Sequence, residues 1–343
     1  MKILYPAYSD SFRCLAGACP DSCCRAWEIC IDPDTVSFYH TVKGRLGEKL
    51  RQSLSTDEDG DAYFPLTDGR CPFLDPDDLC EIHRSLGEAA TSEVCRQFPY
   101  FIEEYEGFTE KCPSLACPAA AELIFAEPLA VDVYPAPPAS PDPLLNLLAS
   151  GRAAALAAAA GDDFHESAVR IRSMARDLQE IADGFDPAAV IYDFDAVLID
   201  PAYAETDAAE KERFRHLTDR FLLFLSEEAE ILTEEWRKLL QASLAAGGEK
   251  NDAGSGSGKI AARENHAADR LLRYFLYRYF LKPVNDGEIL LWTAFILLSV
   301  AVCLVIAGRT GADLFFVARR YSKEIEHDPE NIDRILDFLA EHG

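Results

Sequence analysis

The cysteines are the residues of this sequence best suited to chemistry. Ten of the eleven lie between Cys14 and Cys117, and four of them fall within the stretch CLAGACPDSCC. Cysteine thiolates are soft ligands that bind zinc, copper(I) or iron–sulfur clusters, and each centre takes about four of them. Because chance clustering at this density is improbable, we predict metal ligation by eight thiols: Cys14, Cys19, Cys23, Cys24, Cys71, Cys80, Cys95 and Cys117.

The spacing leaves the number and type of the metal centres open. The eight thiols could serve one four-thiolate site with spare cysteines, or two sites. Neighbours such as Cys23 and Cys24 point in different directions, which allows two metals or one ligand beside a buried thiol. Dense thiolates without nearby histidine favour an iron–sulfur cluster, with zinc as the alternative. Cys30 and Cys303 lie among apolar residues and are expected to be buried hydrophobes, while Cys112 is undecided.

The charge balance limits the partners of the chain. It has 33 basic and 59 acidic residues among 343, a net charge of −26. This argues against a nucleic-acid or anionic-membrane surface and suits a lysine-bearing protein partner. The N-terminal residues contain no apolar run long enough for a signal peptide, so we expect a cytoplasmic protein with reduced thiols. The sequence does not predict an oligomeric state.

One uncharged stretch, ILLWTAFILLSVAVCLVIA at 289–307, is long enough to span a bilayer. The segments on both sides of it are amphipathic, as expected for helices that pack around a buried central helix. A core helix is therefore the preferred interpretation, and a single membrane span is the alternative.

The chain divides into three parts by composition. Residues 1–127 hold the cysteine cluster, 128–143 form a proline-rich connector, and 144–343 have a helical pattern. The predicted fold is mainly α: an irregular, cysteine-rich, metal-stabilised N-terminal region with a short β-hairpin, followed by an α-helical bundle. No glycine-rich turn joins a strand to a helix, so the dinucleotide and phosphate-binding fingerprints are absent.

Several elements can be placed within these parts. A helix of about five turns is expected to start after Asp34 or Thr35, the hairpin to turn at Asp68-Gly69, and a second helix to run from about Pro76 to Gly87. The stretch AAVIYDFDAVLID at 188–200 is a possible strand. Helical segments are expected near 143–158, 164–184, 205–245, 262–281, 288–307, 311–326 and 329–341.

Four stretches together resemble the flagellin lysine-N-methylase (FliB) family: YPAYSDSFRCLAGACPDSCCRAWEICID, CPFLDPDDLCEIHRSLGEAATSEVCRQFP, CPAAAELIF and YSKEIEHDPENIDRIL. The cysteine region is also similar to the wider cysteine-cluster (YkgJ-like) family, which implies chelation of zinc or iron. Cys112 has no place in the family pattern. The matching positions are Cys14, Cys19, Cys23, Cys24, Trp27, Asp32, Cys71, Leu79, Cys80, Cys95, Pro99, Cys117, Pro118, Glu326 and His327.

The resemblance implies a cytoplasmic enzyme that moves methyl groups from S-adenosylmethionine to lysine side chains of flagellin. Such a transfer needs a neutral, aligned amine and a group that accepts its proton; Glu326 and His327 are the candidates. Tyr274 and Tyr321, with Tyr277 and Tyr279 beside them in the pattern, could face the sulfonium cation, although packing in the core is the ordinary role of a tyrosine. The alternative function is a non-enzymatic cysteine-cluster protein that binds zinc or an iron–sulfur cluster.

Overall fold

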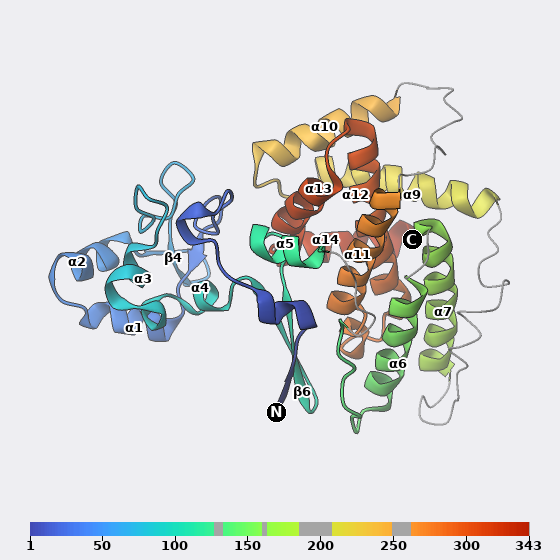
Figure 1. Ribbon diagram of the computed structural model, residues 1–343, viewed down its shortest axis with the longest axis horizontal. Helices are drawn as coiled ribbons and strands as arrows, with labels where there is room; N and C mark the ends of the chain where they lie inside the picture. The colour runs from blue at the N-terminus through green and yellow to red at the C-terminus, as the bar shows by residue number, and fades with distance from the viewer. Residues whose placement is uncertain (127–132, 160–162, 185–207, 249–261, 343) are drawn as a thin grey trace. The chain divides into compact units, whose positions relative to one another are not determined.

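The computed structural model describes residues 1–126, 133–159, 163–184, 208–248 and 262–342 (Figure 1). The chain forms two compact units, which we call the helical unit (Met1–Tyr8, Ile102–Cys112 and Ile124–Gly343) and the thiol unit (Ser9–Phe101 and Pro113–Leu123). The chain thus enters the helical unit three times. Part of the expected connector, 128–132, and the possible strand at 188–200 lie outside the described residues.

The elements of the thiol unit are short. A three-stranded antiparallel sheet has the order β2-β4-β3, with Ile29 paired to Phe64 and Ser55 to Tyr63. Most of the fold around it consists of brief helices and turns, as predicted for this region. In chain order the elements are η1 (Ala7–Ser11), η2 (Ala16–Ala18), β2 (Ile29–Cys30), α1 (Pro33–Thr41), α2 (Gly44–Ser53), β3 (Ser55–Thr56), β4 (Ala62–Phe64), α3 (Glu81–Leu86), η3 (Glu88–Ala90), α4 (Glu93–Gln97) and α5 (Pro118–Ile124).

The expected single helix after Asp34 or Thr35 is wrong, because two helices occupy its place. α1 begins slightly earlier, at Pro33, where the Asp32 carboxylate accepts the backbone N–H of Thr35 at 2.9 Å. It ends at Val42, whose carbonyl is bound by the Arg51 guanidinium at 3.0 Å. Gly44 then takes a φ of 75°, a left-handed conformation that favours glycine. This turn separates α1 from α2.

The predicted turn at Asp68-Gly69 is confirmed, whereas the helix after it is shorter than expected. Both turn residues have positive φ, and Thr67 and Arg70 exchange backbone hydrogen bonds of 2.9 and 3.0 Å across it. The next helix, α3, begins only at Glu81. Upstream of it the Asp75 carboxylate accepts the N–H groups of Asp77 and Leu79, each at 2.9 Å, and so holds a turn instead of a helix. The predicted end at Gly87 is correct.

A second sheet, not predicted, combines the hairpin of β5 (Tyr100–Tyr105) and β6 (Phe108–Pro113) with β1 (Lys2–Leu4). Its order is β1-β6-β5, and β1 runs parallel to β6 with Lys2 opposite Phe108. The remaining elements are α6 (Pro143–Ala158), α7 (Phe164–Gly184), α9 (Ala208–Glu227), α10 (Glu234–Gly248), α11 (Ala262–Tyr279), η5 (Lys282–Val284), α12 (Ile289–Thr310), α13 (Leu314–Tyr321), the π-helical turn η6 (Ser322–Glu326) and α14 (Pro329–His342).

Long-range side chains interrupt the expected helical segment at 205–245. Between α9 and α10, the backbone N–H of Leu232 donates to the Glu324 carboxylate at 2.7 Å, and that of Glu230 donates to the side-chain oxygen of Asn331 at 2.8 Å. These bonds replace the intrahelical bonds that a continuous helix would make. Glu324 and Asn331 follow about ninety to one hundred residues later. The local sequence pattern therefore cannot predict the interruption between α9 and α10.

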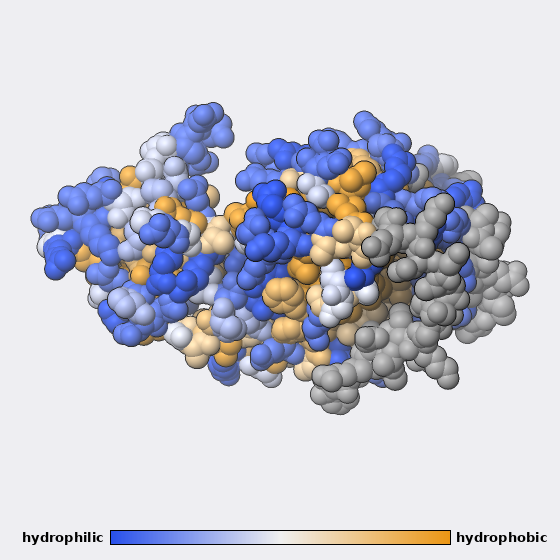
Figure 2. All heavy atoms as spheres, turned by 90° about the horizontal axis from the view of Figure 1, so that it is seen from above, coloured by the Kyte–Doolittle hydropathy of each residue, from blue (hydrophilic) through white to orange (hydrophobic). Residues whose placement is uncertain are grey.

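α12 is the central helix of the helical unit. It contacts α7, α9, α10, α11, α13 and α14 (Figure 1). By length and composition alone it could cross a membrane, but 72% of its most apolar window is buried inside the protein. It therefore occupies the core position that its amphipathic neighbours predict. Among the described residues, hydrophilic side chains form the larger part of the face shown in Figure 2, with hydrophobic patches between them.

A buried ion pair joins β6 to α6 within the helical unit. The guanidinium of Arg152 contacts both carboxylate oxygens of Glu110, at 2.6 and 2.7 Å, and it also donates to the carbonyl of Tyr277 at 3.2 Å. Its side chain is 2% exposed and that of Glu110 is 5% exposed. Because both side chains are shielded from water, each charge is stabilised mainly by its partner.

Candidate functional site

Four of the eight candidate ligands surround one small cavity in the thiol unit. Cys24, Cys71, Cys80 and Cys95 line this four-thiol cavity, which has a volume of about 20 Å³. A space of about 10–15 Å³ suffices for one water molecule, so the cavity has room for a guest of that size. Its other walls are Ile29, Ile31, Tyr39, Phe64, Phe73, Ile82, Thr91 and Ser92.

The local folds direct hydrogen-bond donors at these sulfur atoms. Cys80 precedes α3, and its sulfur accepts the backbone N–H of His83 at 3.5 Å. The Ser92 side chain, which caps α4, hydrogen-bonds the thiol of Cys95. Cys71 is placed beside Cys24 by a backbone hydrogen bond of 2.9 Å between its N–H and the Cys24 carbonyl. Donors to sulfur favour the thiolate form that a metal requires.

Burial shifts the pKa values of these thiols in the opposite direction to the hydrogen-bond donors. It raises the pKa of Cys71 to about 12 and that of Cys95 to about 11, and it also raises the pKa of Cys80. Cys24 behaves differently, because the neighbouring Cys23 thiol donates a hydrogen bond to its sulfur and lowers its pKa to about 7. Cys24 is therefore the thiol of this cavity that ionises first.

Of the other candidate ligands, Cys117 directly precedes α5 and packs in an apolar cluster with Ala119 and Ala120. The sulfur of Cys14 accepts the N–H of Ala16 at 3.4 Å. The sulfur of Cys117 accepts the N–H groups of Ala119 and Ala120, which lower its pKa, while burial has the larger effect and raises it. Negative charge on Cys19 or Cys14 would raise the pKa of Cys117 further.

The structure also places the three cysteines that were set apart from the ligand set. Cys112 and Cys303 are buried in the helical unit, as expected for Cys303. The expectation of a buried Cys30 is wrong, because Cys30 is exposed. It lies in β2, where successive side chains face opposite sides, so that burial of Ile29 and Ile31 turns Cys30 outward.

Among the described residues, no group of three or more Cys, His, Asp or Glu side chains is arranged to hold a metal ion. The role of the eight cysteines as metal ligands stays a prediction.

A second cluster of candidate residues lies in the helical unit around Glu326. This carboxylate ends the π-helical turn η6 and is 4% exposed. The hydroxyl of Tyr274 donates to its two oxygens at 3.0 and 3.1 Å, and that of Tyr279 donates at 3.1 Å. Two residues predicted for the same reaction, Glu326 and Tyr274, therefore meet in the structure. π-Helical turns are frequent at functional sites.

Burial and the polar neighbours of Glu326 shift its pKa in opposite directions. Burial raises its pKa, whereas hydrogen bonds from Ser322 and the two tyrosines and the charge of Arg278 lower it, leaving a net upward shift. A carboxyl group with a raised pKa is a better proton acceptor than an ordinary glutamate.

The remaining candidate tyrosines make other contacts. The Tyr321 hydroxyl shares a hydrogen bond of 2.8 Å with Ser299, and its ring lies edge-on to Trp236 at 6.1 Å. The ring of Tyr277 packs under the Arg152 guanidinium at 4.9 Å. Neither hydroxyl hydrogen-bonds Glu326, so the structure groups Tyr274 with Tyr279 and separates both from Tyr277 and Tyr321.

His327 is partly buried beside this cluster and is held in its neutral form. Burial, with the nearby charges of Arg278 and Lys323, lowers its pKa from 6.5 to about 3. The unfolded chain binds a proton on this residue below about pH 6.5, but the folded chain does not. This residue therefore costs the fold no stability above pH 6.5. As the pH falls from 6.5 towards 3, its protonation in the unfolded chain progressively lowers the free energy of unfolding.

We expect His327→Gln to flatten the pH dependence of unfolding between pH 6.5 and 4. The difference from the unmodified protein should be about 2 kcal/mol at pH 4, with allowance for the partial exposure of the ring. Urea unfolding at a series of pH values measures it. Parallel stability curves for the two proteins would contradict the assigned pKa shift.

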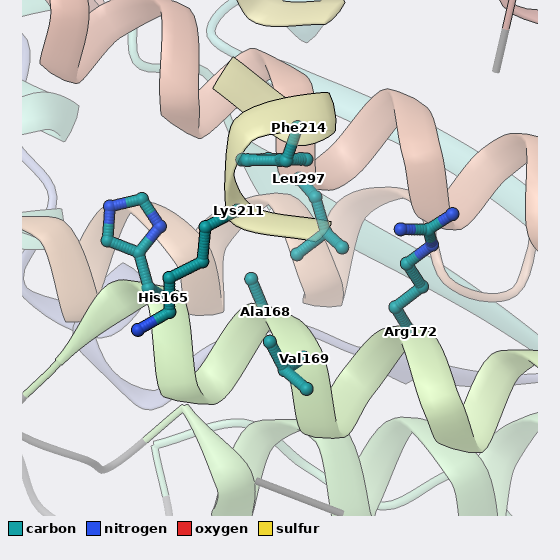
Figure 3. Close-up of a pocket in the computed structure, with 7 residues that line it drawn as sticks. All are labelled: His165, Ala168, Val169, Arg172, Lys211, Phe214 and Leu297. Carbon is teal, nitrogen blue, oxygen red and sulfur yellow. The ribbon is translucent and has the colours of Figure 1, made fainter. Parts of the chain in front are cut away.

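A second hollow, not predicted from the sequence, lies between α7, α9 and α12 (Figure 3). It measures about 30 Å³ and has a floor of small and apolar side chains with three basic groups around it. The basic residues come from two helices far apart in sequence and follow no motif. The lining residues are His165, Ala168, Val169, Arg172, Lys211, Phe214 and Leu297.

These features define a mainly helical protein that carries a separate cysteine-rich unit. The chain is 33% identical over 134 residues to the flagellar biosynthetic protein FliU of Salmonella muenchen, a match that covers 37% of this chain and 79% of FliU. The same identity and length relate it to the proteins named lysine-N-methylase from Salmonella typhimurium (strain LT2) and Salmonella choleraesuis (strain SC-B67). No family model and no solved structure matches the chain.

The chain belongs to the flagellin lysine-N-methylase (FliB) family. Its match spans about a third of the length of the two lysine-N-methylases, 33% in each case.

Proposed function

We propose that this protein is a cytoplasmic lysine N-methyltransferase that uses S-adenosylmethionine to methylate lysine side chains of flagellin. The observation that carries the proposal is the 33% identity over 134 residues with proteins named lysine-N-methylase. The flagellar name of FliU supports a flagellar partner. An excess of 59 acidic over 33 basic residues suits a substrate that presents lysines.

The proposed reaction is a direct displacement. S-adenosylmethionine supplies the methyl group: the bond between its sulfur and the methyl carbon breaks as the lysine nitrogen forms its bond to that carbon. The amine must be neutral to attack, so its proton has to leave to a base first. Glu326 is the group we assign to accept it, because its carboxylate is buried, has a raised pKa and is held by two hydroxyl groups.

Access to Glu326 requires a change in the surrounding side chains, since the carboxylate is almost fully buried. In this proposal Tyr274 and Tyr279 are positioning residues, because their hydroxyl groups fix both oxygens of the carboxylate.

We further assign the thiol unit as a metal-binding unit, with an iron–sulfur cluster as the leading candidate and zinc as the alternative. The donor set fits a soft metal, because four thiols and several donors to sulfur converge on an apolar space. The Tyr39 hydroxyl, which lines this space, has no hydrogen-bond partner among the described residues and could donate to a bound guest. The metal would crosslink short elements that lack a large core.

The proposal is tested by mass spectrometry of flagellin after incubation with anaerobically purified protein and S-adenosylmethionine. We expect a gain of methyl mass on lysine residues, and no gain when S-adenosylmethionine is omitted. If protein that carries its metal leaves flagellin unmodified, the methyltransferase assignment fails, and the four-thiol cavity favours the alternative of a non-enzymatic protein that binds zinc or an iron–sulfur cluster.

A further inference from the structure

We propose that the hollow between α7, α9 and α12 binds a small organic anion with an apolar tail, of the aliphatic carboxylate type. The hollow belongs to the helical unit and is lined by residues that the proposed methylation does not use. The inference therefore goes beyond the proposed function and does not depend on it. It rests on the apolar floor of the hollow, on the basic groups around that floor and on the local pairing of charges.

The floor of the hollow is apolar and is part of the core. Leu297 of α12 lines it and is 2% exposed, and Ala168 and Phe214 continue the apolar surface on α7 and α9. Both of these helices pack against α12, which holds the floor in place. The volume of about 30 Å³ exceeds the roughly 10–15 Å³ that one water molecule needs. The end of a hydrocarbon chain therefore has room to enter and is favoured there by the hydrophobic effect.

Three basic side chains surround this floor. Figure 3 shows His165 and Lys211 at one end of the hollow and Arg172 at the other. His165 lies in the first turn of α7 and Lys211 in the first turn of α9. The first turn of a helix carries the positive end of its dipole, so both helices favour a negative charge at this end of the hollow.

Two of these basic groups have no acidic partner in the part of the chain that the structure describes. The Lys211 ammonium forms no ion pair there, and the His165 ring forms no hydrogen bond. The neighbouring carboxylates have other partners: Asp163 accepts the backbone N–H of His165 at 2.7 Å, and Glu212 pairs with Arg215. In a chain with 59 acidic and 33 basic residues, this arrangement leaves a local positive site that an anion can complement.

The floor and the basic groups together select the class of ligand. An inorganic anion can pair with the basic groups, but it leaves the apolar floor in contact with water. S-adenosylmethionine carries a sulfonium cation, which basic groups repel. A carboxylate with a short hydrocarbon tail suits both features, because the tail can enter the hollow while the carboxylate stays beside Lys211. Each methylene group that becomes buried should raise the affinity about fourfold.

The hollow and the residues assigned to methylation lie on different faces of α12. Phe295 packs against Tyr279 with ring centroids 4.8 Å apart, and Tyr279 donates a hydrogen bond to Glu326. Leu297 follows Phe295 by two positions, a rotation of about 200° around the helix. A ligand in the hollow is therefore separated from Glu326 by the body of α12. Octanoate should bind to Glu326→Gln as tightly as to the unmodified protein.

The test is isothermal titration calorimetry of the full chain with octanoate as the probe. Acetate keeps the charge without the tail, octanamide keeps the tail without the charge, and octylamine reverses the charge. We expect octanoate to bind at least about tenfold more tightly than each of these three compounds. The proposal is wrong if octanoate does not bind. Equal affinity for octanamide would refute the role of the basic groups, and equal affinity for acetate would refute the role of the floor.

Two variants establish whether octanoate occupies the hollow. Lys211→Glu should weaken its binding by about tenfold, whereas Arg213→Glu should leave it unchanged. Arg213 is the matched control, because it is exposed on the same helix and does not line the hollow. Val169→Phe keeps every charge and fills the hollow with a ring, so it should reduce the affinity for octanoate to that for acetate. Octanoate binding that neither Lys211→Glu nor Val169→Phe weakens would overturn the proposal.

The outcome of this test is independent of the methylation assay. The titration needs neither flagellin nor S-adenosylmethionine, so a protein that leaves flagellin unmodified can still bind octanoate. Loss of octanoate binding in Glu326→Gln would contradict the separation of the two sites by α12.

Discussion

The substitution Glu326→Gln is expected to lower the rate of lysine methylation by about 10²–10⁴-fold, the usual contribution of a general base. Glutamine has nearly the same shape and can still accept hydrogen bonds from Tyr274 and Tyr279, so the local packing should persist. What it cannot do is take a proton from the substrate ammonium group. The initial rate of methyl incorporation into flagellin at saturating S-adenosylmethionine measures the loss.

The pH profile separates this catalytic role from a structural one. The raised pKa of Glu326 means that the carboxyl group takes up its proton at a higher pH than an ordinary glutamate. The rate of the unmodified protein should therefore fall on the acid side as this group is protonated, and the residual rate of Glu326→Gln should lack that step. Glu330→Gln, an exposed carboxylate on α14, is the matched control and should keep the full rate. An unchanged rate for Glu326→Gln would exclude this residue as the base.

Replacement of Arg152 by methionine should destabilise the helical unit by about 3–5 kcal/mol. The substitution leaves the Glu110 carboxylate buried without its bidentate partner and removes the hydrogen bond to the Tyr277 carbonyl. Urea unfolding can be followed by the fluorescence of Trp236 and Trp292, which both lie in the helical unit.

The double variant Arg152→Met with Glu110→Leu distinguishes the cost of an unpaired charge from a general loss of packing. Removing both charges should restore most of the lost stability, because an apolar pair of similar volume often replaces a buried ion pair at little cost. If the double variant is as unstable as Arg152→Met alone, the loss of stability comes from packing and not from the unpaired Glu110 carboxylate.

The helices that depend on a continuous apolar face could be predicted well from the sequence. The segments at 143–158 and 164–184 coincide with α6 and α7, and α12 and α14 differ from their predictions by a few residues. Two of the errors arise where a side chain from outside the segment competes with the local pattern. Glu324 and Asn331 separate α9 from α10, and Arg51 binds the carbonyl that ends α1.

At the candidate sites, too, the residues could be predicted from the sequence, whereas their grouping in space could not. The thiols could be found from their density, but the grouping of four of them around one cavity depends on how short elements fold together. Glu326 and Tyr274 were both candidates, yet only the packing of α11 against η6 shows that they meet while Tyr321 turns to Ser299. The hollow at His165 and Lys211 brings together residues from three helices and has no sequence signal.

The late position of α12 in the chain affects how the protein can fold during translation. α7, α9 and α10 pack against this helix, but the ribosome makes all three before it. Their apolar faces have no partner until residues 289–310 have emerged, and exposed surfaces of this kind recruit chaperones and promote aggregation. The thiol unit, whose last residue is Leu123, is complete much earlier. The nascent chain can therefore complete the thiol unit before the central helix of the helical unit has been made.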